Sequence, residues 1–133
     1  MIGRSKFGVR NDPKGMADRT RDGHLFASKL ERIRYDELKL LERAGHIYKL
    51  TLQAPFNLVV KGPFGEEVIV AKYIADFTYW EKGFGTKMIV EDVKGMRTPV
   101  YNLKKRMMMA CYNVKIKEWP EKVRKVRVKR CSK

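Results

Sequence analysis

The stretch VIVAKYIADFTYW (residues 68–80) and the stretch MIVEDV (residues 88–93) decide the fold, and EKGFG (81–85) follows the first of them. Both stretches are rich in β-branched and aromatic residues, and the glycine-containing segment between them is typical of a turn. Upstream, residues 48–60 have the same character and are followed by KGPFG (61–65). Three consecutive strands joined by short turns predict an antiparallel meander.

Helical patterns flank this meander. Residues 28–44 have helical spacing, Ser28 followed by Glu31 is typical of a capping box, and Gly45 is typical of a helix end. The side chains expected on the buried face of this helix are Phe26, Leu30, Ile33, Leu40, Leu41 and Ala44. Thr98-Pro99 predicts the start of a second helix, and residues 114–119 predict another strand. The resulting α-β-β-β-α-β order predicts one α/β domain with a mixed central sheet.

The two ends of the chain are polar and basic. Residues 1–23 predict a flexible N-terminal arm, in which NDPKG (11–15) is typical of a turn. Residues 24–133 are expected to form the functional domain, and residues 122–133 are expected to be an edge strand or an extended basic arm. No apolar run has the length of a membrane span and no signal-peptide pattern is present, so the sequence predicts a cytoplasmic protein without a membrane partner.

Charge is the strongest feature of the composition. The chain has 30 Lys and Arg against 15 Asp and Glu, and residues 97–133 hold thirteen of the basic side chains and two of the acidic ones. Such a field favours a polyanion, because binding one releases condensed counterions. Nucleic acid is therefore the expected partner, ahead of an anionic membrane surface. The residues expected to contact a DNA backbone are Lys104, Lys105, Arg106, Arg124, Lys125, Arg127, Lys129 and Arg130.

A candidate site lies on the second and third predicted strands. The period of two along a strand places Asp92 and Lys94 on the same face. Asp76 interrupts an otherwise apolar strand, and the short turn after Trp80 can bring it beside Asp92. Two carboxylates among apolar side chains repel each other, and a divalent cation relieves that repulsion. Because hard oxygen ligands are present without neighbouring His or Cys, the sequence favours Mg²⁺, with Mn²⁺ as a second choice.

Such a site suits phosphodiester hydrolysis. A bound cation polarises the scissile phosphate and lowers the pKa of a coordinated water. Lys94 would orient that water or neutralise charge on the phosphoryl oxygens. Glu91 is an alternative ligand to Asp92, although it is expected on the opposite face from Lys94. Glu37 falls near the middle of the predicted apolar stripe, where an acid is costly without a partner, and it would bond a buried backbone group or support the site.

Each of these residues also has a purely structural interpretation. Asp92 and Lys94 are compatible with a surface charge patch, Asp76 with a solvated strand end, and Glu31 with helix capping alone. His24 and His46 are isolated and are expected on the surface or in loops.

The pattern resembles the PD-(D/E)XK nuclease superfamily over about residues 22–119, and within it a family of small phage proteins that includes Holliday junction resolvase-like endonucleases. The resemblance is carried by FASKLE (26–31), YIADF (73–77) and VEDVKG (90–95). Ala75 stands where the superfamily name has Pro, and the second acid is Asp, which the motif allows. The segment LQAPF (52–56) is also similar to a segment of that family.

The resemblance implies a restriction-endonuclease-like domain and a set of roles. Asp76 and Asp92 match the two acids of the motif, Lys94 matches its lysine, and Glu31 matches a glutamate that many members carry on the first helix. The main-chain carbonyl of Val93 is implied as a further metal ligand, and Gln53 is implied at the rim of the site.

Together these features predict a Mg²⁺-dependent endonuclease that recognises DNA by shape, such as a Holliday junction resolvase encoded by a bacteriophage and active in the host bacterial cytoplasm. Resolving a junction requires two symmetric cuts, so a homodimer is expected. The alternatives are a nuclease acting on DNA ends, flaps or nicks, and a basic nucleic-acid-binding protein without catalytic activity. The two acids favour an enzyme, because a protein that only binds phosphates has no need of carboxylates facing them.

Overall fold

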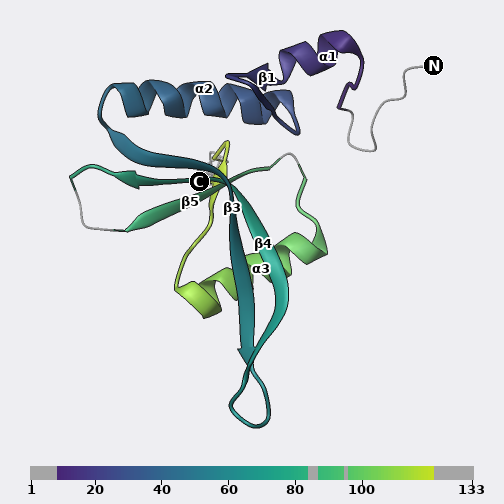
Figure 1. Ribbon diagram of the computed structural model, residues 1–133, viewed down its shortest axis with the longest axis vertical. Coiled ribbons are helices and arrows are strands. Elements are labelled where there is room, and N and C mark those ends of the chain that lie inside the picture. The colour runs from purple at the N-terminus through teal and green to yellow at the C-terminus, as the bar shows by residue number, and fades with distance from the viewer. Residues whose placement is uncertain (1–8, 84–86, 95, 122–133) are drawn as a thin grey trace, which may run out of the picture.

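A computed structural model describes residues 9–83, 87–94 and 96–121. In this part of the chain the elements form a single mixed α/β domain (Figure 1). In chain order they are α1 (Pro13–Asp18), β1 (Thr20–Arg21), β2 (His24–Leu25), α2 (Lys29–Arg43), β3 (Ile47–Lys61), β4 (Glu67–Glu81), β5 (Met88–Val93), α3 (Pro99–Tyr112) and β6 (Lys117–Trp119). From α2 onward they follow the predicted α-β-β-β-α-β order, which is confirmed.

The main sheet has the strand order β3-β4-β5-β6. The first two pairings are antiparallel, whereas β6 pairs with β5 in parallel after α3 has carried the chain back. The predicted mixed sheet is therefore confirmed. The β3–β4 hairpin is much longer than β5 and β6. Strand β5 pairs only with Phe77–Trp80 of β4, so most of the hairpin has no third strand beside it in the described part of the chain. The hairpin consequently projects beyond the rest of the domain (Figure 1).

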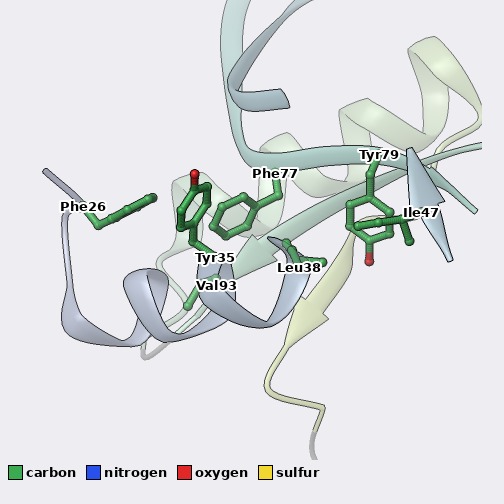
Figure 2. Packing of buried hydrophobic residues seen from close by; sticks show 7 residues of the cluster. All are labelled: Phe26, Tyr35, Leu38, Ile47, Phe77, Tyr79 and Val93. Carbon is green, nitrogen blue, oxygen red and sulfur yellow. The ribbon is translucent and has the colours of Figure 1, made fainter. Parts of the chain in front are cut away.

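Two hydrophobic clusters hold the helices against this sheet. The first lies under α2 and consists of Phe26, Tyr35, Leu38, Ile47, Phe77, Tyr79 and Val93 (Figure 2). The second lies under α3 and consists of Leu58, Tyr73, Ala75, Val90, Tyr101, Met108 and Ile116. Strand β4 contributes to both clusters. Phe77 and Tyr79 belong to the first cluster, and Tyr73 and Ala75, earlier on the strand, belong to the second. Asp76 therefore lies where one strand passes between the two cores.

The buried face of α2 differs from the predicted one. Its buried residues are Glu31, Arg34, Tyr35 and Leu38, whereas Leu40 is 64% exposed. The predicted stripe is confirmed for Phe26 and Leu30, which belong to the first cluster or pack against it. It was wrong for Leu40, Leu41 and Ala44, which are exposed, because charged Glu31 and Arg34 take two of the four buried positions. The helix ends agree better with expectation, since the Ser28 hydroxyl accepts a hydrogen bond from the Glu31 amide at 3.1 Å and Ala44 is the C-cap.

The described part of the N-terminal segment is more ordered than the flexible arm expected over residues 1–23. Asp12 caps α1 by accepting from the Gly15 amide at 2.9 Å, and β1 pairs with β2. The segment NDPKG is thus the start of a short helix, with Pro13 at its first position, where the missing amide costs nothing. None of the helices in the described ranges is long and apolar enough to cross a membrane.

Candidate functional site

Asp76 and Asp92 meet where the β4–β5 ladder ends. Phe77 pairs with Glu91, and the two aspartates are the next residues along their strands. The Val93 amide donates a hydrogen bond to Asp76 Oδ2 at 2.8 Å, which fixes the first carboxylate against the second strand. The expected neighbourhood of these two acids is therefore present.

Asp92 is 2% exposed, and both of its carboxylate oxygens have partners. The Tyr73 hydroxyl donates to Oδ2 at 2.6 Å, and Lys94 Nζ lies 3.0 Å from Oδ1. Lys94 also lies 4.0 Å from the centroid of the Tyr101 ring, a cation–π distance. The one-residue spacing of Asp92 and Lys94 thus places carboxylate and amine in direct contact.

Glu31 brings a third acid to this place from the first turn of α2. Its residue is buried, and its Oε2 atom has no hydrogen-bond partner. Burial raises the pKa of Glu31, and the charge of Asp92 raises it further, against the lowering effects of the Ala27 amide, Lys94 and Arg19. A buried carboxylate oxygen without a partner is costly, so this atom is free to take a ligand.

Asp76 shows the strongest perturbation of the acids. Burial raises its pKa to about 8, and the negative charges of Glu31 and then Asp92 contribute in the same direction. Like charges that share a desolvated site have this effect, and a cation placed among them would reverse it. We refer to Glu31, Asp76, Asp92 and Lys94 as the acidic centre.

The carboxylates of the acidic centre are suitable ligands for a hard dication, but their present arrangement is not that of a metal site. In the described ranges, no three Asp, Glu, His or Cys side chains already lie in a metal-binding arrangement. At Asp92, Tyr73 and Lys94 occupy the two carboxylate oxygens. Carboxylate oxygens are the ligands that Mg²⁺ prefers, and Glu31 Oε2 is unpartnered, so these side chains have the chemistry to hold a hard dication but would have to reorient to do so.

Other predicted site residues lie apart from this centre. Glu91 is fully buried on the opposite side of β5, where Arg34 holds it through Nη2 at 2.8 Å, which leaves it no role as a ligand beside Lys94. Glu37 is half-exposed and bonds Arg34 Nη1 at 2.8 Å. Glu37 is therefore linked through Arg34 to Glu91 rather than to Asp76, and a supporting role for it at the site stays a prediction. The side chain of Val93 packs in the first cluster.

Gln53 is exposed on β3 with a φ of 51°, between Leu52, which pairs with Phe77, and Ala54, which pairs with Ala75. It therefore lies across from Asp76, consistent with a place at the rim of the acidic centre. A positive φ in a non-glycine residue is uncommon and marks a local irregularity of the strand.

The basic residues expected to contact DNA divide into two groups. On α3, Arg106 is exposed, Lys104 is half-buried, and Lys105 forms an ion pair with Glu118, which also binds Arg97. The charge of Lys105 is thus partly neutralised within the protein. Arg124, Lys125, Arg127, Lys129 and Arg130 lie outside the described residues.

Sequence reasoning missed three residues around the acidic centre and the arginine that holds Glu91. Tyr73 and Tyr101 contact Asp92 and Lys94, Arg34 holds Glu91, and Arg19 affects the charge of Glu31. Only Tyr73 had a signal in the sequence, as a polar-tipped aromatic side chain three residues before Asp76. The others come from helices and from the N-terminal segment, whose packing against the sheet no local pattern reveals.

The fold and the acidic centre define a small mixed α/β domain with three acids and a lysine gathered at the end of two strands. The chain belongs to the family described as protein of unknown function (DUF1064), whose model matches residues 14–128. A search of curated proteins found no match. No solved structure matched either.

Proposed function

We propose that this protein is a metal-dependent endonuclease that hydrolyses DNA phosphodiesters at the acidic centre. The observation that carries the proposal is the convergence of Glu31, Asp76 and Asp92 on one buried place, where the pKa of Asp76 rises to about 8. Structural ion pairs also perturb pKa values, but they do so by pairing opposite charges. Here three acids meet a single lysine, an excess of negative charge that a dication would balance.

The roles of the residues follow from their positions. Glu31, Asp76 and Asp92 would hold Mg²⁺ or Mn²⁺, with the Val93 carbonyl as a further ligand. When bound, the cation would supply charge neutralisation at the scissile phosphate and a water of lowered pKa. Lys94, released from Asp92, would orient that water or donate to a phosphoryl oxygen. Tyr73 would keep the Asp92 carboxylate aimed at the site through its 2.6 Å hydrogen bond.

DNA is the proposed substrate because the chain carries a formal net charge of +15. Contacts from basic side chains to phosphates position DNA without reading its sequence, which suits recognition of a branch or junction. A Holliday junction resolvase of bacteriophage type, active as a homodimer in the host cytoplasm, is the specific form of the proposal, and cleavage of ends, flaps or nicks is the alternative within the same chemistry.

The test compares the wild type with Asp76→Asn, Asp92→Asn and Lys94→Gln on a four-way junction and a linear duplex, with Mg²⁺, Mn²⁺ or EDTA. Glu37→Gln is the matched control, because it removes an acid of α2 that lies outside the acidic centre. We expect cleavage by the wild type and by Glu37→Gln, and loss of at least a hundredfold in the other three, consistent with the size of an electrostatic contribution to a transition state.

Equal cleavage by Asp92→Asn and the wild type would refute the proposed centre. Salt-sensitive binding without cleavage of any substrate, by protein that folds normally, would favour a binding protein without catalytic activity. Paired symmetric nicks in the junction alone would support resolution, whereas equal cutting of both substrates would exclude it.

A further inference from the structure

A cavity of about 500 Å³ lies beside the acidic centre. Its walls come from Arg19, from residues 23–27 between β1 and the start of α2, and from Leu52 and Gln53 of β3. Two of the residues that line it are neighbours of the acidic centre. The Ala27 amide interacts with the Glu31 carboxylate, and Gln53 lies across the ladder from Asp76. The cavity is therefore close to the proposed cleavage site, although no residue of the acidic centre lines it.

Arg19 gives this cavity its positive charge. The residue is 9% exposed, and its guanidinium donates to the carbonyls of Phe26 at 2.8 Å and Ala27 at 3.3 Å and to Asn11 Oδ1 at 3.1 Å. All three partners are neutral oxygens, and no ion pair of Arg19 occurs in the described part of the chain. Its buried Nε atom has no hydrogen-bond partner. The charge of Arg19 lowers the pKa of Glu31, but no carboxylate of the described residues bonds the guanidinium directly. A buried cation held only by neutral oxygens is costly, and an anion in the cavity would offset part of that cost.

The other polar side chains on the cavity wall suit the same ligand. His24 and Gln53 are both exposed, and each offers a hydrogen-bond donor. The volume is within the range of small-ligand sites and is large enough for a phosphate with part of its nucleoside. No acidic side chain lines the cavity among the described residues.

We propose that this cavity binds a phosphate group of a nucleic-acid strand, next to the phosphate held at the acidic centre. Arg19 supplies the charge, and His24 and Gln53 supply further donors. The identity of the polymer rests on the proposed function, whereas binding of the phosphate does not, because it requires neither metal nor cleavage. The N-terminal segment would thus form one wall of the substrate site in addition to covering the sheet.

The probe is thymidine 3′,5′-bisphosphate, added in EDTA to isotopically labelled protein and followed by amide chemical shifts, with thymidine as the ligand control. We expect saturable shifts in residues 19, 23–27 and 52–53 with the bisphosphate and not with thymidine. Arg19→Gln should weaken the binding at least tenfold, in line with loss of a charge-assisted hydrogen bond. Arg21→Gln is the matched control, because Arg21 is an exposed arginine of β1 that pairs with Asp36 outside the cavity.

Because Arg19 also ties β2 to α2, a second variant keeps the test independent of folding. Gln53→Glu places a negative charge on the cavity wall at an exposed position, and it should weaken the bisphosphate at least tenfold with unchanged thermal stability. Wild-type affinity in Gln53→Glu, or shifts confined to α3, would overturn the proposal. A wild-type protein that cleaves DNA but does not bind the bisphosphate would reject this inference alone, and a wild-type protein that binds the bisphosphate but cleaves no DNA would reject the proposed function alone.

Discussion

Asp76 is an acid whose ionisation is opposed by burial and by two neighbouring carboxylates, and this has a consequence for stability. Its pKa rises from 3.8 to about 8 in the folded chain. The folded state therefore keeps a proton that the unfolded state has already lost over most of the range between these values. It follows that, without metal, this group makes the protein less stable as pH rises from about 4 to about 8, after which its contribution is constant.

Asp76→Asn should remove that dependence. In EDTA we expect the variant to be more stable than the wild type at pH 8 by about 1–3 kcal/mol. Each pKa unit represents ~1.4 kcal/mol, and this range is a discounted part of the total for the shift from 3.8 to about 8. The two proteins should converge near pH 4. Urea unfolding at pH 4, 6 and 8 measures this difference. A wild type that gains stability over this range relative to Asp76→Asn would show that the carboxylate is held ionised by a contact other than metal.

The same residue predicts a response to metal. Mn²⁺ or Mg²⁺ at about one hundred times its dissociation constant should stabilise the wild type by about 2.7 kcal/mol, because the ligand binds only the folded state. Asp76→Asn and Asp92→Asn should gain much less, whereas Glu37→Gln should behave as the wild type. Thermal melts at pH 8 with and without cation give the comparison, and equal gains in all four proteins would mean that the ions bind elsewhere.

At the scale of elements, α2 and β5 are joined by a buried ion pair. Arg34 Nε and Nη2 both donate to the Glu91 carboxylate, at 3.0 and 2.8 Å to Oε1, and Arg34 also lies 5.3 Å from the Trp119 ring centroid. Removing one partner of such a pair leaves the other charge buried, whereas removing both can be nearly neutral. The pair therefore fixes how α2 sits on the sheet, and with it the place of Glu31.

Arg34→Met should lower the free energy of unfolding by about 3–5 kcal/mol. The double variant Arg34→Met with Glu91→Leu should recover most of that loss, because no unpaired charge remains. Glu37→Gln removes the half-exposed partner of Arg34 and should cost no more than about 1 kcal/mol. Urea unfolding of the wild type, Arg34→Met, Glu91→Leu and the double variant forms a double-mutant cycle, and additive losses would show that the pair does not couple the two elements.

The elements differ in how far the sequence predicted them. The strands were predictable because long β-branched and aromatic runs between glycine turns have few other solutions, and Asp92 with Lys94 followed from the period of two. The face of α2 was not fully predictable, because Arg34 is buried through its bond to Glu91 of β5 and Glu31 is buried at the acidic centre, and neither is visible in the local spacing. The cavity wall around Arg19 was missed because α1, β1 and β2 are too short to give a periodic signal.

For the whole molecule, the distribution of charge predicts how DNA binding depends on salt. Removing one basic side chain that binds a phosphate should reduce the slope of log affinity against log salt by about 0.9. Arg106→Gln should reduce the slope by that amount, whereas Lys105→Gln should have a smaller effect because Glu118 already binds that amine. Changing Arg124, Lys125, Arg127, Lys129 and Arg130 together to glutamine should reduce the slope by about 4.5 if each binds one phosphate. Binding titrations in EDTA at several salt concentrations measure these slopes. An unchanged slope in the variant with all five residues changed would show that DNA does not bind these C-terminal side chains.

The projecting hairpin bears on the expected homodimer. Phe64 at its turn is 95% exposed, and Ile69, Val70 and Ile74 of β4 are also exposed. Because β5 pairs only with Phe77–Trp80, the outer edge of the first part of β4 has no strand beside it among the described residues. A free edge and exposed apolar side chains together are typical of a surface that pairs with another strand.

If two copies paired at this edge in antiparallel fashion about an axis between Ile69 and Val70, Glu67 of one chain would lie opposite Lys72 of the other. Cross-strand opposite charges favour such a register. If the homodimer forms here, Ile69→Lys should yield a monomer that keeps its fold, Lys72→Glu should weaken the dimer, and Glu67→Lys with Lys72→Glu should restore it. Leu40→Lys, at an exposed apolar position of α2, is the control and should leave the dimer intact. Sedimentation equilibrium distinguishes these outcomes, and a dimer that survives Ile69→Lys but dissociates in Leu40→Lys would move the interface to the outer face of α2.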